Sequence, residues 1–152
     1  MALQSSVGIT VGVSATLPST HDDSGFGGLT YVACGKLSDV PPMTGVFDTA
    51  AFDNMSTGEE EKFGDMLRAG SGSLMFGYDL VADTGQAALE TAADAVADAD
   101  KKVALEFTLK DGTVYYRLAI ITSYVPEAAT GSVLMANVSA EFYRKHIKVD
   151  PS

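Results

Sequence analysis

The chain has 152 residues, of which 20 are acidic and 10 basic, so its formal charge is −10. This length suits a single domain, residues 1–152, with a core of its own, and the single cysteine, Cys34, excludes an intrachain disulfide. The acidic balance disfavours a tight nucleic-acid binder, because affinity for phosphates depends on clustered lysine and arginine.

The N-terminal part predicts two strands and no targeting segment. It lacks a basic n-region, and no stretch approaches the roughly 20 apolar residues of a membrane span, so we expect assembly in the cytoplasm without membrane insertion. Valine and isoleucine alternate with small residues over residues 7–15, which is typical of a strand. Residues 18–28 predict a loop, whose His-Asp-Asp triplet at 21–23 has no second histidine cluster to complete a metal site. A second strand is expected over residues 29–37, with Cys34 as a buried small hydrophobe.

Residues 38–70 form a long polar excursion with two adjacent prolines, several glycines and three consecutive glutamates. Connections longer than about 15 residues are uncommon inside compact domains and usually bind something or become ordered on binding. We therefore predict a long inserted loop, the alternative being a floppy or locally structured insert without a contact role. Large apolar residues recur in it, and we expect some to pack on the domain or on a neighbouring chain. The candidate inter-subunit contacts are Val46, Phe47, Phe52, Met55, Glu59, Glu60, Glu61 and Phe63.

A strand and a helix are predicted next. The strand covers residues 73–81, with one face formed by Leu74, Phe76, Tyr78 and Leu80. The helix begins at Asp83 or Thr84, either of which can cap it. Its narrow apolar stripe, formed by Leu89, Ala92, Ala93 and Val96, predicts close packing against a sheet.

Residues 101–123 predict a β-hairpin closed by the two-residue turn Asp111-Gly112, because Asp-Gly tolerates the positive φ angles of a type I′ turn. This turn pairs Lys110 with Thr113 and leaves one wholly apolar face, with the pairs Leu109–Val114, Phe107–Tyr116, Leu105–Leu118 and Val103–Ile120. On the other face, Glu106 lies opposite Arg117 and Thr108 opposite Tyr115. We expect this second face to be exposed to water.

The C-terminal part predicts a turn over residues 124–131 and a last strand over residues 132–143. Its inward face is expected to hold Leu134, Ala136, Val138, Ala140 and Phe142. The basic run at residues 144–148 predicts a solvated tail or a contact with an acidic patch of a neighbour.

The order of these elements resembles that of the tail tube (major tail) proteins of long, flexible-tailed bacteriophages. The resemblance rests on residues 29–40 (LTYVACGKLSDV), 67–79 (LRAGSGSLMFGYD) and 86–89 (QAAL), and on Asp111-Gly112 followed by residues 115–125. It covers roughly residues 29–142, and it is a match of order and spacing.

The resemblance implies a mainly β fold, a β-sandwich or partly open barrel with one flanking helix, similar to the tube protein of type VI secretion systems. It also implies hexameric rings stacked into a hollow tube for viral DNA delivery, located in the virion tail. The implied partners are further copies of the chain and the tape measure, tail terminator and tail tip proteins, while DNA passes without specific binding. In such a ring, Glu106, Thr108 and Arg117 are candidate channel-facing residues.

Two other functional classes make different predictions. A monomeric β-sandwich module for binding, virion decoration or adhesion would use the excursion as its recognition loop and would not polymerise. An enzyme needs an acid–base pair or an activated nucleophile, and neither can be assembled from two isolated histidines and one cysteine. We therefore expect a structural protein without cofactor or metal.

Overall fold

The computed structural model describes residues 3, 7–79, 83–128 and 133–151. It is mainly β, with two antiparallel sheets and few helices. The strands are β1 (Thr10–Ser14), β2 (Val32–Cys34), β3 (Leu37–Asp39), β4 (Val46–Asn54), β5 (Glu59–Arg68), β6 (Ser71–Gly77), β7 (Lys102–Thr108), β8 (Val114–Glu127) and β9 (Met135–Val149). The helices are α1 (Asp23–Gly27), α2 (Thr84–Asp94) and the 3-10 helix η1 (Asp98–Lys101).

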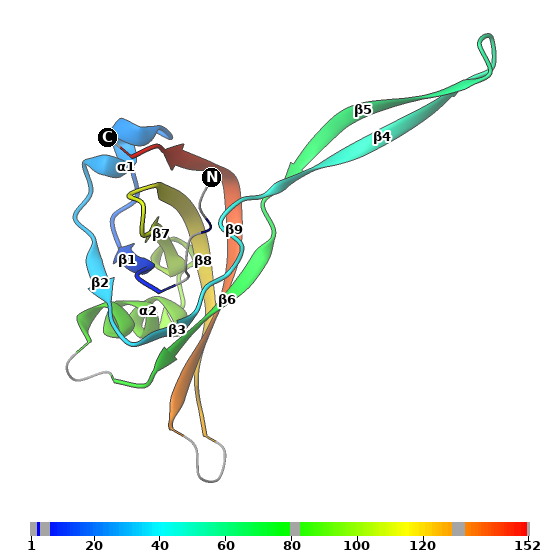
Figure 1. Ribbon diagram of the computed structural model, residues 1–152. Helices are drawn as coiled ribbons and strands as arrows, with labels where there is room; N and C mark the ends of the chain where they lie inside the picture. Colours follow the sequence, from blue (N-terminus) through cyan, green and yellow to red (C-terminus); the bar gives the residue numbers. More distant parts are fainter. Residues whose placement is uncertain (1–2, 4–6, 80–82, 129–132, 152) are drawn as a thin grey trace.

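Seven strands form one curved sheet in the order β2-β1-β7-β8-β9-β6-β3 (Figure 1). Its two edge strands, β2 and β3, are consecutive in the chain and are joined by only Gly35 and Lys36. The sheet therefore curls until its edges approach each other, although within the described residues it does not close into a barrel. The predicted fold class, mainly β with a partly open barrel and a flanking helix, is confirmed.

The core lies on both faces of the central strands β7 and β8. The larger cluster fills the inside of the curved sheet and includes Leu105, Phe107 and Ile121 together with Leu89 of α2. A smaller cluster covers the opposite face, where Phe26 of α1 packs with Ala104, Tyr116 and Leu118. The Phe26 and Tyr116 rings stack with their centroids 5.2 Å apart. Both faces of the hairpin are thus buried, whereas one apolar and one wet face were expected.

Helix α2 is the predicted flanking helix, and it contacts β8, β2 and β1. The Asp83 side chain caps it by accepting hydrogen bonds from the amides of Gly85 and Gln86, as predicted. The helix ends at Asp94, so Val96 lies beyond it and is 98% exposed. The prediction that Val96 belongs to the apolar stripe of the helix is therefore wrong.

The register of the β7–β8 hairpin differs by one residue from the prediction. Leu109 donates its amide to the Thr113 carbonyl at 2.8 Å, which leaves a three-residue loop, and Gly112 has φ 97°. A type I turn followed by a left-handed residue accounts for this geometry, and Asp-Gly serves it as well as the expected two-residue turn. The shift places Glu106 opposite Tyr116 and Leu105 opposite Arg117.

Other predicted boundaries also change. The strand expected over residues 29–37 is divided into β2 and β3, with Lys36 in the left-handed region at φ 57°. The 18–28 loop contains α1, and the turn expected over 124–131 begins later because β8 continues to Glu127. The basic run at 144–148 belongs to β9, where Lys148 pairs with Tyr115, so a solvated tail was wrong. The ends of two predicted strands, at residues 80–81 and 132, lie outside the described residues.

Candidate inter-subunit interface

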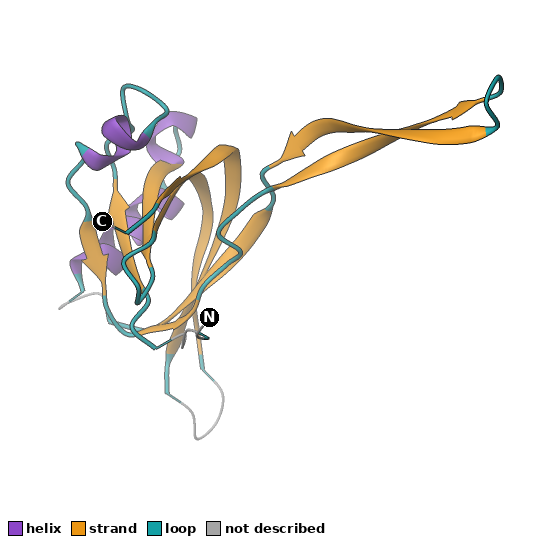
Figure 2. Ribbon diagram, turned by 45° about the horizontal axis from the view of Figure 1, so that its top comes forward, coloured by secondary structure: helices purple, strands orange, loops and turns teal. Residues whose placement is uncertain are grey.

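The predicted inserted loop is an extended β-hairpin, formed by β4 and β5. Its strands pair without interruption from Thr49–Gly64 to Asn54–Glu59 and constitute a separate two-stranded sheet. Gly58, at φ 74°, closes the tip by donating its amide to the Asn54 carbonyl at 2.8 Å. The hairpin projects away from the curved sheet (Figures 1 and 2). At about 3.3 Å per residue, the nine residues of β4 extend roughly 30 Å.

All eight candidate contact residues lie on this hairpin, and none is buried. The apolar side chains of Val46, Phe47, Phe52, Met55 and Phe63 are 66, 60, 56, 96 and 52% exposed, and Glu59, Glu60 and Glu61 are exposed as well. An isolated two-stranded hairpin is only marginally stable in water, and contiguous exposed apolar groups mark interaction surfaces. The structure thus gathers the predicted residues on one projecting element, while their contact with another chain stays a prediction.

The two strands divide these residues between opposite faces. Phe52 lies directly opposite Glu61, and alternation along β5 places Glu59 and Phe63 on the same face as Glu61. We call these four residues the acidic face of the hairpin. It combines two aromatic rings with two carboxylates, so it offers both apolar area and charge to a partner.

The base of the hairpin is held from inside the domain by Arg117 of β8, which is 1% exposed. Its guanidinium donates to the carbonyl oxygens of Pro42 at 3.1 Å and Ala69 at 2.6 Å, one on each side of the hairpin. It also lies 4.0 Å from the centroid of the Phe142 ring, and burial lowers its pKa to about 10. A planar guanidinium with several donors can join two carbonyl groups in this way, so Arg117 fixes how the hairpin leaves the domain.

The expected water-exposed pair of Glu106 and Arg117 is wrong, because the register shift turns the two side chains to opposite faces of β7 and β8. Arg117 has no surface to present to a channel. Glu106 lies beside Tyr116, and burial raises the pKa of its carboxyl. Thr108 lies opposite Val114 and is half-buried. A channel-facing role for Glu106 and Thr108 stays a prediction.

Sequence reasoning missed the role of Arg117. One signal was available, since a lone arginine in an otherwise apolar central strand must find acceptors when it is buried. The carbonyl groups that accept its hydrogen bonds come from segments 75 and 48 residues away in the chain, and no local pattern indicates that approach.

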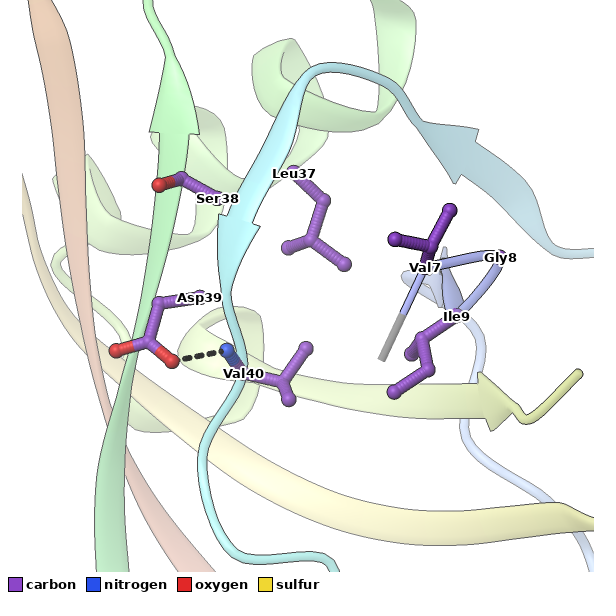
Figure 3. Close-up of a pocket in the computed structure, with 7 residues that line it drawn as sticks. All are labelled: Val7, Gly8, Ile9, Leu37, Ser38, Asp39 and Val40. Carbon is purple, nitrogen blue, oxygen red and sulfur yellow. Dashed lines mark hydrogen bonds between the residues drawn. The ribbon is translucent and has the colours of Figure 1, made fainter. Parts of the chain in front are cut away.

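A groove of about 430 Å³ lies between the edge strand β3 and the segment that precedes β1. Figure 3 shows the side chains of Leu37 and Val40 directed toward Ile9 and Val7, whereas Ser38 and Asp39 point away. The Asp39 carboxylate accepts a hydrogen bond from the Val40 amide at 2.9 Å. The groove thus combines apolar side chains with polar groups beside a sheet edge.

A buried polar network joins the two edges of the curved sheet to α2. Asp83 accepts a hydrogen bond from the Gly35 amide at 2.7 Å, and Gln86 donates to the Gly77 carbonyl at 2.9 Å and accepts from the Tyr124 hydroxyl at 2.9 Å. The hydrogen bonds of these polar groups therefore hold the edges of the curved sheet against α2. Cys34 is buried beside this network, as predicted.

In the described part of the chain, the histidine, cysteine, aspartate and glutamate side chains include no group of three or more that could hold a metal ion. None of the helices in this part combines the length and the hydropathy that a membrane crossing requires.

Comparison with known proteins relates the chain to tail-like injection assemblies by fold. No family model and no curated protein sequence matches it. A chain from the sheath/tube terminator of an extracellular contractile injection system (PVC, extended state) superposes with a TM-score of 0.64 at 11% identity, over 99% of both chains. A chain from the anti-feeding prophage baseplate, a 6-fold symmetrised structure, gives 0.64 at 10% identity, over 98% of this chain and 97% of that one. A chain from the cap that terminates the anti-feeding prophage tube gives 0.62 at 14% identity, over 98 and 92%. At these identities the likeness shows a shared fold.

Proposed function

We propose that this chain is a structural subunit of a tail-like tube and that it polymerises through stacked rings into a hollow conduit. The observation that carries the proposal is the β4–β5 hairpin, which exposes six large apolar side chains, the five predicted contact residues and Met66, on an element that leaves the folded core. Such a surface is expected to be covered by another protein, because apolar area removed from water contributes about 25 cal/mol per Å².

The fold supports the same class of function. Structures that share it come from a sheath/tube terminator, a baseplate and a tube cap, and the 6-fold symmetry of one of them supports a hexameric ring. The two edges of the curved sheet also offer strands that a neighbour in a ring can cover. A conduit for DNA in a bacteriophage tail agrees with the net charge of −10, because an acidic wall repels a polyanion.

Sedimentation of the purified chain over a range of concentrations, with negative-stain microscopy of the same samples, tests this proposal. We expect rings or tubes whose amount rises with concentration. A chain that stays monomeric at every concentration would contradict the proposal and favour a binding, decoration or adhesion module. Rings that never stack would favour a terminator, because one structure of similar fold comes from a sheath/tube terminator.

A trimmed variant provides the matched control. Thr49 and Gly64 are cross-strand partners, so replacing residues 50–63 by Asn-Gly closes a short hairpin with a favoured two-residue turn. We expect this variant to unfold cooperatively like the natural chain but to remain unassembled. If the variant assembles at the same concentration as the natural chain, the outer hairpin is not part of the interface.

A further inference from the structure

The last strand, β9, contains an irregularity that exposes two cations. Between the pairs Tyr116–Ile147 and Leu118–Tyr143, a single residue of β8 faces three residues of β9. Within this bulge Arg144 adopts φ 62°, and His21 Nε2 lies 2.6 Å from the Lys145 carbonyl oxygen. Bulges of this kind redirect side chains, and a non-glycine residue held at positive φ is a pointer to a functional position.

The bulge carries unpaired positive charge in an acidic protein. Arg144 and Lys145 are both exposed, and neither takes part in any ion pair recorded among the described residues. We call these two residues the basic bulge. The hairpin has the opposite character, because the acidic face presents Glu59 and Glu61, which are likewise outside the recorded ion pairs of the described chain.

We propose that the acidic face of one copy docks on the basic bulge of a second copy. This inference rests on the proposed assembly and names the surfaces that would join two subunits. Charge complementarity identifies the occupant as a second copy, since the two surfaces carry two carboxylates and two cations. Phe52 and Phe63 would supply apolar area beside the carboxylates, while the charges select the orientation.

The two surfaces cannot meet within one chain as it is folded. The base of the hairpin is held by Arg117, and in both overall views its tip points away from the curved sheet that carries the bulge (Figures 1 and 2). Each copy therefore has one donor surface and one different acceptor surface. Contacts of this head-to-tail type either close into rings or continue without limit, as a ring or tube requires.

Charge exchange tests the contact. The variants E59K/E61K and R144E/K145E should each raise the concentration needed for sedimentable assembly about tenfold, and the combined variant should restore assembly, because opposite charges again face each other. D94K/D100K on and after α2 makes the same change in net charge as E59K/E61K and should leave assembly unaltered. The proposal would be overturned if E59K/E61K and R144E/K145E each assembled like the natural chain, or if the combined variant assembled as poorly as these two.

A cross-linking experiment separates this proposal from the proposed function. Two full-length variants, E61C and K145C, are mixed and treated with a short bismaleimide, and we expect a dimer that contains one copy of each. The natural chain is the control, because its Cys34 is buried. A mixed dimer with no tubes in any sample would retain the docking and reject tube formation. Tubes without a mixed dimer would reject the docking and retain the tube.

Discussion

Replacing Arg117 by methionine should destabilise the domain and loosen the hairpin. The substitution keeps an unbranched apolar stem but removes both hydrogen bonds, to Pro42 at 3.1 Å and to Ala69 at 2.6 Å. Hydrogen bonds from charged groups contribute about 1.5–3 kcal/mol each, and water can replace the donor at the exposed Pro42, so we expect a total loss of about 3 kcal/mol. For a chain of this size, that loss lowers the melting temperature by roughly 6–12 °C.

Urea unfolding followed by circular dichroism measures this change, and hydrogen exchange localises it. The Phe142 amide, which donates to the Gly70 carbonyl at 2.9 Å beside the hairpin base, should exchange faster in Arg117→Met. Arg68→Met is the matched control, because Arg68 forms an exposed ion pair with Asp48 and should lose no more than about 1 kcal/mol. A loss in Arg117→Met as small as in this control would refute the assignment of Arg117 as the residue that holds the hairpin.

Three further outcomes follow from the packing and titration of single residues. Gly85→Ala should cost about 1–3 kcal/mol in urea unfolding, because its new Cβ would lie 2.6 Å from Cys34 Sγ, and an unchanged midpoint would contradict this packing. The Cys34 thiol, whose pKa burial raises to about 12, should react with a thiol reagent only as fast as the domain opens, and rapid reaction at pH 8 would exclude its burial. Burial, with the Arg117 charge, lowers the pKa of His146 below 6.5, so the stability gained from its neutral form is present above pH 6.5 and is lost as the pH falls through the lowered value. His146→Gln should then lose less stability than the natural chain between pH 7.5 and 5.5, and equal losses would argue against this titration. The raised pKa of Glu106 has the opposite effect on stability, but Glu106 is present in both proteins, so it does not affect their difference.

Local sequence was sufficient wherever one element decides its own conformation. Asp83 caps α2 because an aspartate before a helical stripe satisfies the first free amides wherever the helix lies. Alternation placed Ala136, Val138, Ala140 and Phe142 on the buried face of β9, as predicted, whereas Leu134, predicted on the same face, precedes the strand and is exposed. The existence of the β7–β8 hairpin also followed from its turn residues and its apolar strands.

The register of that hairpin was decided by the tertiary structure. Asp111-Gly112 fits both a two-residue and a three-residue loop, so turn chemistry alone does not separate them. Alternation failed to decide because Phe26 and its neighbours cover the second face, so both faces of the strands accept apolar residues. The partners of Arg117 depend on this register. The prediction of an exposed pair with Glu106 was wrong because it assumed the two-residue turn.

Sequence alone showed that residues 38–70 carry more large apolar groups than a linker needs, and it predicted that some of them pack on the domain or on a neighbouring chain. It could not determine that the segment is a hairpin, because glycines, acidic residues and a bulge between Phe47 and Thr49 obscure its alternation. Sequence alone also did not predict that the basic run at residues 144–148 is part of a strand, because its charges are typical of a solvated tail and its pairing with β8 appears only in the folded chain. In both segments the strand conformation depends on backbone hydrogen bonds to a partner strand, and only the folded chain determines which strand that is.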